Sequence, residues 1–175
     1  LPEYASLCGI TEEEMREQMG EDIGRLADNL GVTPEGALGA LKSNYDGYHF
    51  TWPSPDIYNP FSLLNALADS KLNSYWFGSG TPTYLIEMLN KYHVKPQQIG
   101  ARKFLAESFD APTERMVDIT PLLYQSGYIT IKDYSSLTNL YTLDIPNKEV
   151  RMGLMKSLLP NYLHQYTADG LTTVA

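Results

Sequence analysis

The residues best suited to chemistry in this sequence are three histidines and one cysteine, and their spacing is unfavourable for it. His49, His93 and His164 lie far apart, and Cys8 is distant from all three. None of them forms an H-E-x-x-H or C-x-x-C pattern, which are typical of metal or redox sites. Asp46 and His49 are close enough to share a hydrogen bond, but no Ser or Cys nucleophile is patterned with them. The sequence therefore predicts no catalytic and no metal-binding residue.

The sequence also lacks the motifs of phosphate-binding loops. The sequence contains neither G-x-x-x-x-G-K-[ST] nor G-x-G-x-x-G. Residues 78–81 could bind an anion through backbone N–H groups at a helix start, but no Lys follows, which favours a plain turn and cap. Glu12, Glu13 and Glu14 suit the first turn of a helix, where they interact favourably with its dipole. No cofactor-binding residue is predicted in this chain.

Composition and charge restrict the class of protein. Hydrophobic residues make up 43% and charged residues 19%, which is ordinary globular usage rather than disorder. No segment has the roughly 20 apolar residues of a membrane span, and a single cysteine permits no internal disulfide, so a cytoplasmic location is expected. The net charge of -8 disfavours strong nucleic-acid binding. The best basic group is diluted by acidic residues and consists of Lys91, Lys95, Arg102 and Lys103.

Helix signals dominate the first two thirds of the chain. Thr11 and Glu14 have capping-box spacing, and apolar residues follow at steps of three and four as far as Leu30, before Gly31. A cap residue followed by proline then predicts four further helix starts, because proline lacks an N–H that the first helical position does not use. These starts are Thr33-Pro34, Asn59-Pro60, Thr81-Pro82 and Thr120-Pro121. Phe104, Leu105 and Phe109 suggest one more helix.

After Gly127 the apolar period changes from helix to strand. Residues 128–132 and 141–145 alternate and predict a β-hairpin, and Pro146-Asn147 should cap a helix that Pro160 kinks or ends. Helix, hairpin and helix are the layout of the second half of a winged-helix module. The predicted fold class is mostly α with a small α+β part. It comprises a lid-like helical bundle (1–114), a winged-helix-like module with one hairpin (115–168) and a tail (169–175).

Residues 45–52 form a dense aromatic turn, and residues 75–77 form a second aromatic cluster. Such clusters usually fix loops or form interfaces, with ligand recognition as the alternative. Gly47 lies where a tight turn requires a positive φ. If His49 points outward, its substitution by alanine should have little effect on stability. We therefore predict a structural staple in which rings of the turn pack on the next helix: Tyr45, Tyr48 and Phe50 against Phe61 and Leu64.

Several of these segments resemble the predicted AAA-ATPase-like family of prokaryotic proteins. Residues 45–50 are similar to its Y-D-G-Y-x-F motif, 58–64 to Y-N-P-F-S-L-L, and 75–82 to Y-W-x-x-T-G-T-P, with a departure at Gly78-Ser79. Further matching segments are 4–14, 122–131 and 145–151. The signature positions, whose role the resemblance leaves open, are Tyr45, Asp46, Gly47, Tyr48, Phe50, Tyr58, Asn59, Pro60, Phe61, Trp76, Gly127, Tyr128, Pro146, Asn147, Glu149 and Arg151.

The resemblance implies a piece of a longer polypeptide, as does a chain that starts at Leu1 rather than Met. Family members have an upstream P-loop ATPase core, which would bind ATP and Mg²⁺, then this region, then a PD-(D/E)XK nuclease-like domain. The expected function is a non-catalytic lid and winged-helix portion that couples nucleotide state to the downstream domain. The alternatives are a nucleic-acid-binding winged-helix module with weak affinity and a protein-interaction scaffold.

Overall fold

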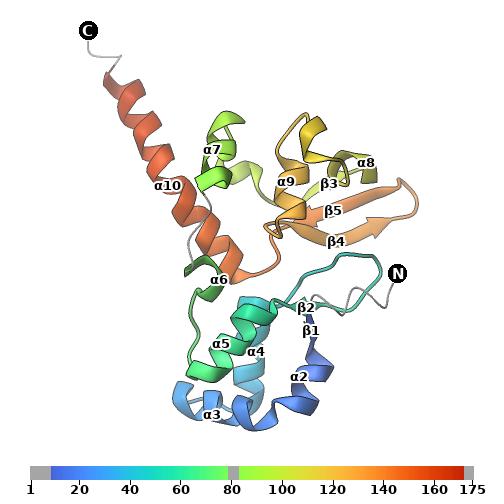
Figure 1. The fold of residues 1–175 in the computed structure, drawn as a ribbon, viewed down its shortest axis with the longest axis vertical. Coiled ribbons are helices and arrows are strands. Elements are labelled where there is room, and N and C mark those ends of the chain that lie inside the picture. Colours follow the sequence, from blue (N-terminus) through green and yellow to red (C-terminus); the bar gives the residue numbers. More distant parts are fainter. Residues whose placement is uncertain (1–8, 79–82, 172–175) are drawn as a thin grey trace.

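The computed structural model describes residues 9–78 and 83–171. Figure 1 shows the helices of the first part of the chain gathered at one end of the molecule and a sheet with shorter helices at the other. The last helix, α10 (Lys148–Leu171), begins between these two parts and extends along the second. The chain is thus mostly helical with a small α+β part, which confirms the predicted fold class.

The first helices begin as predicted, but the first one is interrupted. Strand β1 (Ile10–Thr11) leads into α2 (Glu12–Gln18), where the Thr11 hydroxyl accepts from the Glu14 N–H and the Glu14 carboxylate accepts from the Thr11 N–H. A second helix, α3 (Gly20–Leu30), follows directly and ends at Gly31, which has a φ of 68°. The single helix predicted over this stretch is therefore wrong. Met19 leaves the helical conformation (φ -125°, ψ 24°), next to a glycine with low helix propensity.

The next two helices have the predicted cap and proline. Helix α4 (Pro34–Tyr45) is capped by the Thr33 hydroxyl, and α5 (Pro60–Asp69) by the Asn59 side chain, each of which accepts a backbone N–H. Strand β2 (Ile57–Tyr58) lies between them and pairs antiparallel with β1. Two helices follow, α6 (Tyr75–Gly78) and α7 (Thr83–Lys91). The predicted start at Thr81-Pro82 and the turn 78–81 fall largely outside the described residues.

The sheet has one strand more than the predicted hairpin. Strands β4 (Thr130–Ser135) and β5 (Leu140–Asp144) form the hairpin, and β3 (Arg102–Phe104) pairs with the other side of β5. The helix suggested by Phe104, Leu105 and Phe109 is present only at Ala106–Phe109, while Phe104 lies in β3, because pairing with the free edge of β5 favours the strand conformation. Only short helical pieces flank β3: η2 (Pro96–Gln98), α8 (Ala106–Phe109) and η3 (Thr113–Arg115).

The remaining helices differ from the prediction in detail. Helix α9 (Thr120–Gln125) contains Thr120 as its first residue, and the carboxylate of Asp118 accepts from the Thr120 N–H at 2.7 Å. Helix α10 is capped by Asn147, whose side-chain oxygen accepts from the Val150 N–H at 3.1 Å. It continues through Pro160 to Leu171, so of the two predicted effects of this proline, a kink or an end of the helix, the end is wrong. Within the described ranges, no helix is both long and apolar enough to cross a membrane.

The buried side chains form two separate hydrophobic cores. The first core lies among α2 to α5 and consists of Met15, Ile23, Leu26, Ala27, Ala37, Leu38, Leu41, Tyr45, Tyr58, Leu63, Ala66 and Leu67. The second core lies between the sheet and α7, α9 and α10, and it includes Leu85, Leu89, Phe109, Ile131, Leu143, Val150 and Leu154. The cores do not follow the boundary predicted at residue 114, because residues 85–109 pack with the hairpin. Tyr48 and Ile57 come from the first part of the chain but belong to the second core.

Candidate functional site

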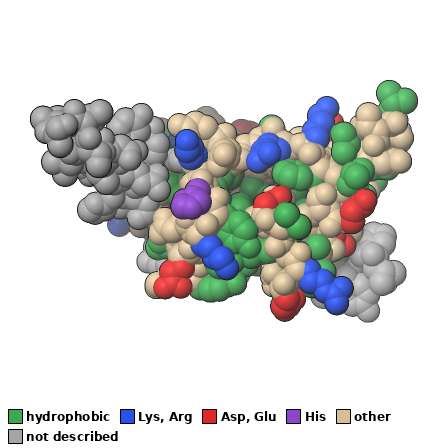
Figure 2. Space-filling model, turned by 90° about the horizontal axis from the view of Figure 1, so that it is seen from above, with side chains coloured by type: hydrophobic (Ala, Val, Ile, Leu, Met, Phe, Trp, Pro, Cys, Tyr) green, Lys and Arg blue, Asp and Glu red, His purple; other side chains and the backbone are tan. Residues whose placement is uncertain are grey.

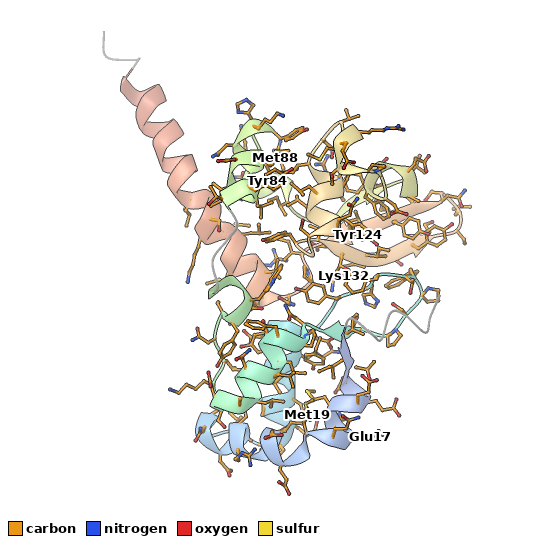
Figure 3. The ribbon with its side chains drawn as sticks, in the orientation of Figure 1. Glu17, Met19, Tyr84, Met88, Tyr124 and Lys132 are labelled. Carbon is orange, nitrogen blue, oxygen red and sulfur yellow. The ribbon has the colours of Figure 1, made fainter. Side chains whose placement is uncertain are left out.

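The turn that follows α4 lies where the two cores meet. Gly47 has the predicted positive φ, at 95°, and Tyr48 forms an antiparallel bridge with Ile57. The ammonium of Lys132, from β4, donates to the carbonyl oxygens of Gly47 and Pro146 at 2.5 and 3.1 Å. Figure 3 places Lys132 between the sheet and the helices of the first core. One half-buried cation thus ties this turn to the residues just before α10.

Further hydrogen bonds hold the backbone of the same turn. The Asn147 side-chain amide donates to the Asp46 carbonyl at 3.0 Å. The hydroxyl of Thr130 accepts from the His49 N–H at 2.8 Å and donates to the His49 carbonyl at 2.6 Å. These partners are 81 and 101 residues apart in sequence. The turn is therefore positioned by groups of the second core, since buried backbone groups require partners.

Glu149, in the first turn of α10, connects three helices. Its carboxylate accepts from the Ser62 hydroxyl of α5 at 2.7 Å and from the Trp76 N–H of α6 at 3.1 Å. The side chain is buried, and this burial raises the pKa of the Glu149 carboxyl above its usual value. A buried carboxylate with both oxygens satisfied resists displacement, because separating it from its donors would leave them unpaired.

We use the name junction for these contacts between the cores. It comprises the turn 46–49 and the groups that hold it and the start of α10 in place: Ser62, Trp76, Thr130, Lys132, Pro146, Asn147 and Glu149. Most signature positions belong to the junction or border it, and Trp76 and Tyr128 have their rings 5.1 Å apart beside it. Phe50, Phe61 and Arg151 are the exposed members of the set. The segments of the resemblance, which are distant in sequence, thus converge in space.

The junction also contains partly compensated charge. The Asp46 carboxylate is buried and pairs with the Lys42 ammonium at 3.0 Å rather than with His49. Burial raises the pKa of Asp46, which its hydrogen bond to Lys42 opposes, and burial lowers the pKa of Lys132. Sequence reasoning missed Lys132, because nothing in a strand pattern marks a lysine that turns inward. It also missed Lys42, whose half-exposed side chain reaches the Asp46 carboxylate four residues on.

His49 is buried, so the condition under which its substitution should have little effect is not met. Its Nδ1 lies 3.0 Å from the Ser54 hydroxyl, its Nε2 contacts the Asp56 carboxylate, and its ring centroid lies 4.9 Å from that of Trp52. This brings together a serine, a histidine and an aspartate that the sequence pattern did not reveal. However, the Ser54 hydroxyl donates its proton to the Thr51 carbonyl at 2.8 Å. Together these contacts hold the loop that carries His49, Ser54 and Asp56 in place.

The aromatic staple is present with different partners from those predicted. Tyr45 and Tyr48 are buried, but Phe50, Phe61 and Leu64 are 42%, 52% and 48% exposed. Helix α5 buries its other face, which carries Ser62, Leu63, Ala66 and Leu67. The Tyr45 hydroxyl instead bonds the backbone of Asn73. A pocket of about 180 Å³ opens beside the junction, lined by Tyr48, Phe50, Ile57, Tyr58, Asn59, Pro60, Trp76 and Gly127.

The remaining candidate residues do not form a site. Lys91, Lys95, Arg102 and Lys103 are exposed, and the Arg102 guanidinium lies 5.6 Å from the ring centroid of Phe104. In the part of the chain that the structure describes, no three His, Cys, Asp or Glu side chains are grouped to hold a metal ion. Cys8 lies outside this part.

Comparison with known proteins yields one informative match. No family model matches the sequence, and no solved structure matches it. The chain is similar to a protein of Azotobacter chroococcum mcd 1 described as an uncharacterized protein in the vnfD 5' region. The two are 28% identical over 165 residues, which covers 91% of this chain and 29% of that protein. The chain therefore spans less than a third of the length of its curated relative.

The buried carboxyls of the junction predict a pH dependence of stability. Since the pKa values of Glu149 and Asp46 are raised on folding above 4.5 and 3.8, the folded chain binds protons more strongly than the unfolded chain. Their contribution is fully present below these unfolded values and is lost as pH rises through the folded values. We expect Glu149→Gln to flatten this fall, as measured by urea midpoints between pH 5 and 7. An unchanged pH slope in the variant would show that Glu149 titrates as it does in the unfolded chain.

Proposed function

We propose that this chain is a non-catalytic coupling module of a longer protein, with a lid-like helical part and a winged-helix-like part. The observation that carries the proposal is the junction. Two cores that lack a shared hydrophobic interior meet through buried, directional hydrogen bonds at Asp46, Asn147 and Glu149. Directional hydrogen bonds of this kind fix the orientation of one core relative to the other. A displacement of one core therefore displaces the other.

The order of the elements in the second part supports the winged-helix description. Helix α7, strand β3, helices α8 and α9, and strands β4 and β5 follow in sequence, and β5 is central in the sheet. In DNA-binding proteins of the helix-turn-helix type, a recognition helix enters the major groove. Here the corresponding helix, α9, contains no Lys or Arg, and its residues Thr120 to Leu123 are buried.

The distribution of charge also favours coupling over nucleic-acid binding. On the face in Figure 2, Lys and Arg side chains are separated by apolar, polar and acidic ones. A strip of phosphates needs several neighbouring cations to release its counterions. The net charge of -8 acts in the same direction. A protein-interaction scaffold remains compatible with these surfaces, and coupling is the more specific form of that role.

The link to nucleotide rests on the resemblance of the signature positions. On this proposal ATP and Mg²⁺ bind to an upstream ATPase core of the same polypeptide, and the module transmits the bound state toward a nuclease-like domain. The length of the relative, of which this chain spans 29%, is compatible with such neighbours. No residue of this chain is assigned to catalysis.

The proposal is tested by hydrogen exchange of the longer protein with and without ATP. We expect ATP to change the exchange of amides in both cores of the wild type, and in only the first core of Asn147→Ala, which lacks the bond to the Asp46 carbonyl. Asn65→Ala is the matched control, because the Asn65 amide bonds only the Phe61 carbonyl of its own helix. An absence of any ATP effect, or full transmission in Asn147→Ala, would refute coupling through the junction.

A further inference from the structure

The side of α5 that faces away from the first core is apolar. Phe61 and Leu64 are 52% and 48% exposed, and Ala68, one turn further on, is exposed as well. Together with Pro60 these positions lie within about 100° of the helix circumference, since successive residues are about 100° apart. Phe50, 42% exposed, extends this surface, because it lines the same pocket as Pro60. We use the name outer face for these five residues.

Helix α5 has few groups that favour contact with water. Residues 57–68 contain no Asp, Glu, Lys or Arg. The polar side chains within this part of the helix have partners in the chain, since the Ser62 hydroxyl donates to the Glu149 carboxylate and the Asn65 amide to a backbone carbonyl. The opposite side of α5 packs in the first core. A helix that is apolar all round is typical of a buried position, which favours a partner that covers the outer face.

The size of the outer face indicates what kind of partner fits it. Phe50, Phe61 and Leu64, each about half exposed, together offer on the order of 300 Å². A stable complex between separate proteins buries about 800 Å² of each partner. Partners on one polypeptide have an effective concentration of about millimolar, so a smaller interface holds them together. The outer face is therefore better suited to a partner in the same polypeptide than to a separate protein or a second copy.

The path of the chain favours a partner on the amino-terminal side. Strand β1, the first strand of the described chain, pairs with β2, and Ile10 lies opposite Tyr58. Strand β2 leads through Asn59 directly into α5, so the chain enters beside the start of this helix. Helix α10 instead carries the other end of the chain along the second part of the molecule. The 29% of the relative that this chain spans leaves ample sequence for such a partner in a longer protein.

We infer that the outer face of α5 is the docking surface for the part of the same polypeptide that precedes Leu1. The partner segment is apolar and uncharged, because no charged group on the outer face would compensate a charge buried against it. The inference rests on the proposed function, in which an ATPase core precedes this chain. It adds the surface through which that core contacts the module.

Photo-crosslinking of the longer protein in the absence of ATP tests the inference. The photoreactive residue p-benzoylphenylalanine replaces Leu64 on the outer face or, as the control, Tyr84, which is 56% exposed on α7. After irradiation and digestion, mass spectrometry identifies the crosslinked peptides. We expect the probe at Leu64 to crosslink within one molecule to residues upstream of Leu1, at least about tenfold more than the probe at Tyr84.

A lysine on the outer face should abolish docking without unfolding the module. With the probe at Phe61, we expect Leu64→Lys to reduce the upstream crosslinks at least about tenfold, because the ammonium would be buried without a partner, whereas Tyr84→Lys should leave them unchanged. In the 175-residue chain, Leu64→Lys should shift the melting temperature by no more than about 2 °C, as is usual for an exposed position.

Three results would overturn the inference. They are crosslinks between two copies, crosslinks only to sequence after Ala175, and equal or absent upstream crosslinks at Leu64 and Tyr84. Because no ATP is present, the result does not depend on coupling. Upstream crosslinks without an ATP effect on hydrogen exchange would refute coupling alone. An ATP effect in both cores without upstream crosslinks would refute only the docking surface.

Discussion

Gly47→Ala is expected to lower the free energy of unfolding by about 3 kcal/mol or more. An alanine at a φ of 95° adopts a conformation that costs L-residues roughly 1–2 kcal/mol. Its Cβ would also lie 2.5 Å from the Pro146 carbonyl oxygen and 2.6 Å from the Lys132 Nζ. The carbonyl belongs to the backbone before α10 and cannot turn aside, so the clash adds about 1–3 kcal/mol. Urea denaturation measures the loss.

Gly39→Ala is the matched control for this substitution. Gly39 lies within helix α4, and nothing is found within 4 Å of a Cβ built there. Alanine is favoured over glycine inside a helix by about 1 kcal/mol, so this variant should be slightly more stable than the wild type. A Gly47→Ala protein as stable as Gly39→Ala would mean that the turn does not hold the two cores together.

Tyr48→Ala is expected to cost about 3–5 kcal/mol, the usual range for removing a buried aromatic ring. Tyr48 is 6% exposed, and its ring packs in the second core. Its backbone forms an antiparallel bridge with Ile57, in the segment that leads into α5. Its loss should therefore loosen both parts of the chain, which thermal unfolding by circular dichroism detects. His49→Ala should also destabilise the chain, because His49 is buried and bonded to Ser54 and Asp56.

Tyr84→Ala provides the control for Tyr48. Tyr84 is 56% exposed on α7, where Figure 3 labels it, and a surface substitution of this kind usually changes stability by no more than about 0.5 kcal/mol. Similar losses in the two tyrosine variants would indicate that the aromatic turn contributes no more than an exposed ring. The staple would then be wrong.

The sequence was sufficient for the local structure because caps and turns are local. The side chains of Thr11, Thr33 and Asn59 each accept from a backbone N–H three residues later in the chain. Each helix start can therefore be predicted from a few neighbouring residues. Strand β3 was not predictable in this way. It has only three residues, two of which are charged, and they become a strand because the hairpin that follows in sequence presents a free edge.

The candidate site was predictable in part. The resemblance selected the signature positions, and the turn chemistry at Gly47 was correct. The contacts that these positions make could not be predicted from the sequence. Glu149 bonds a residue 87 positions away, and Asn147 bonds one 101 positions away. The inward orientation of His49 depends on Ser54 and Asp56, which only the folded loop brings to the ring.

The central claim is that the junction makes two cores behave as one unit, and native-state hydrogen exchange of the chain tests it directly. The amides of Leu26 and Leu41 report on the first core, and those of Ile131 and Leu143 on the second. We predict one common opening free energy for these amides in the wild type and two distinct values in Glu149→Ala, where Ser62 and Trp76 lose their acceptor. Independent opening of the two cores in the wild type, or an undivided value in Glu149→Ala, would contradict the account.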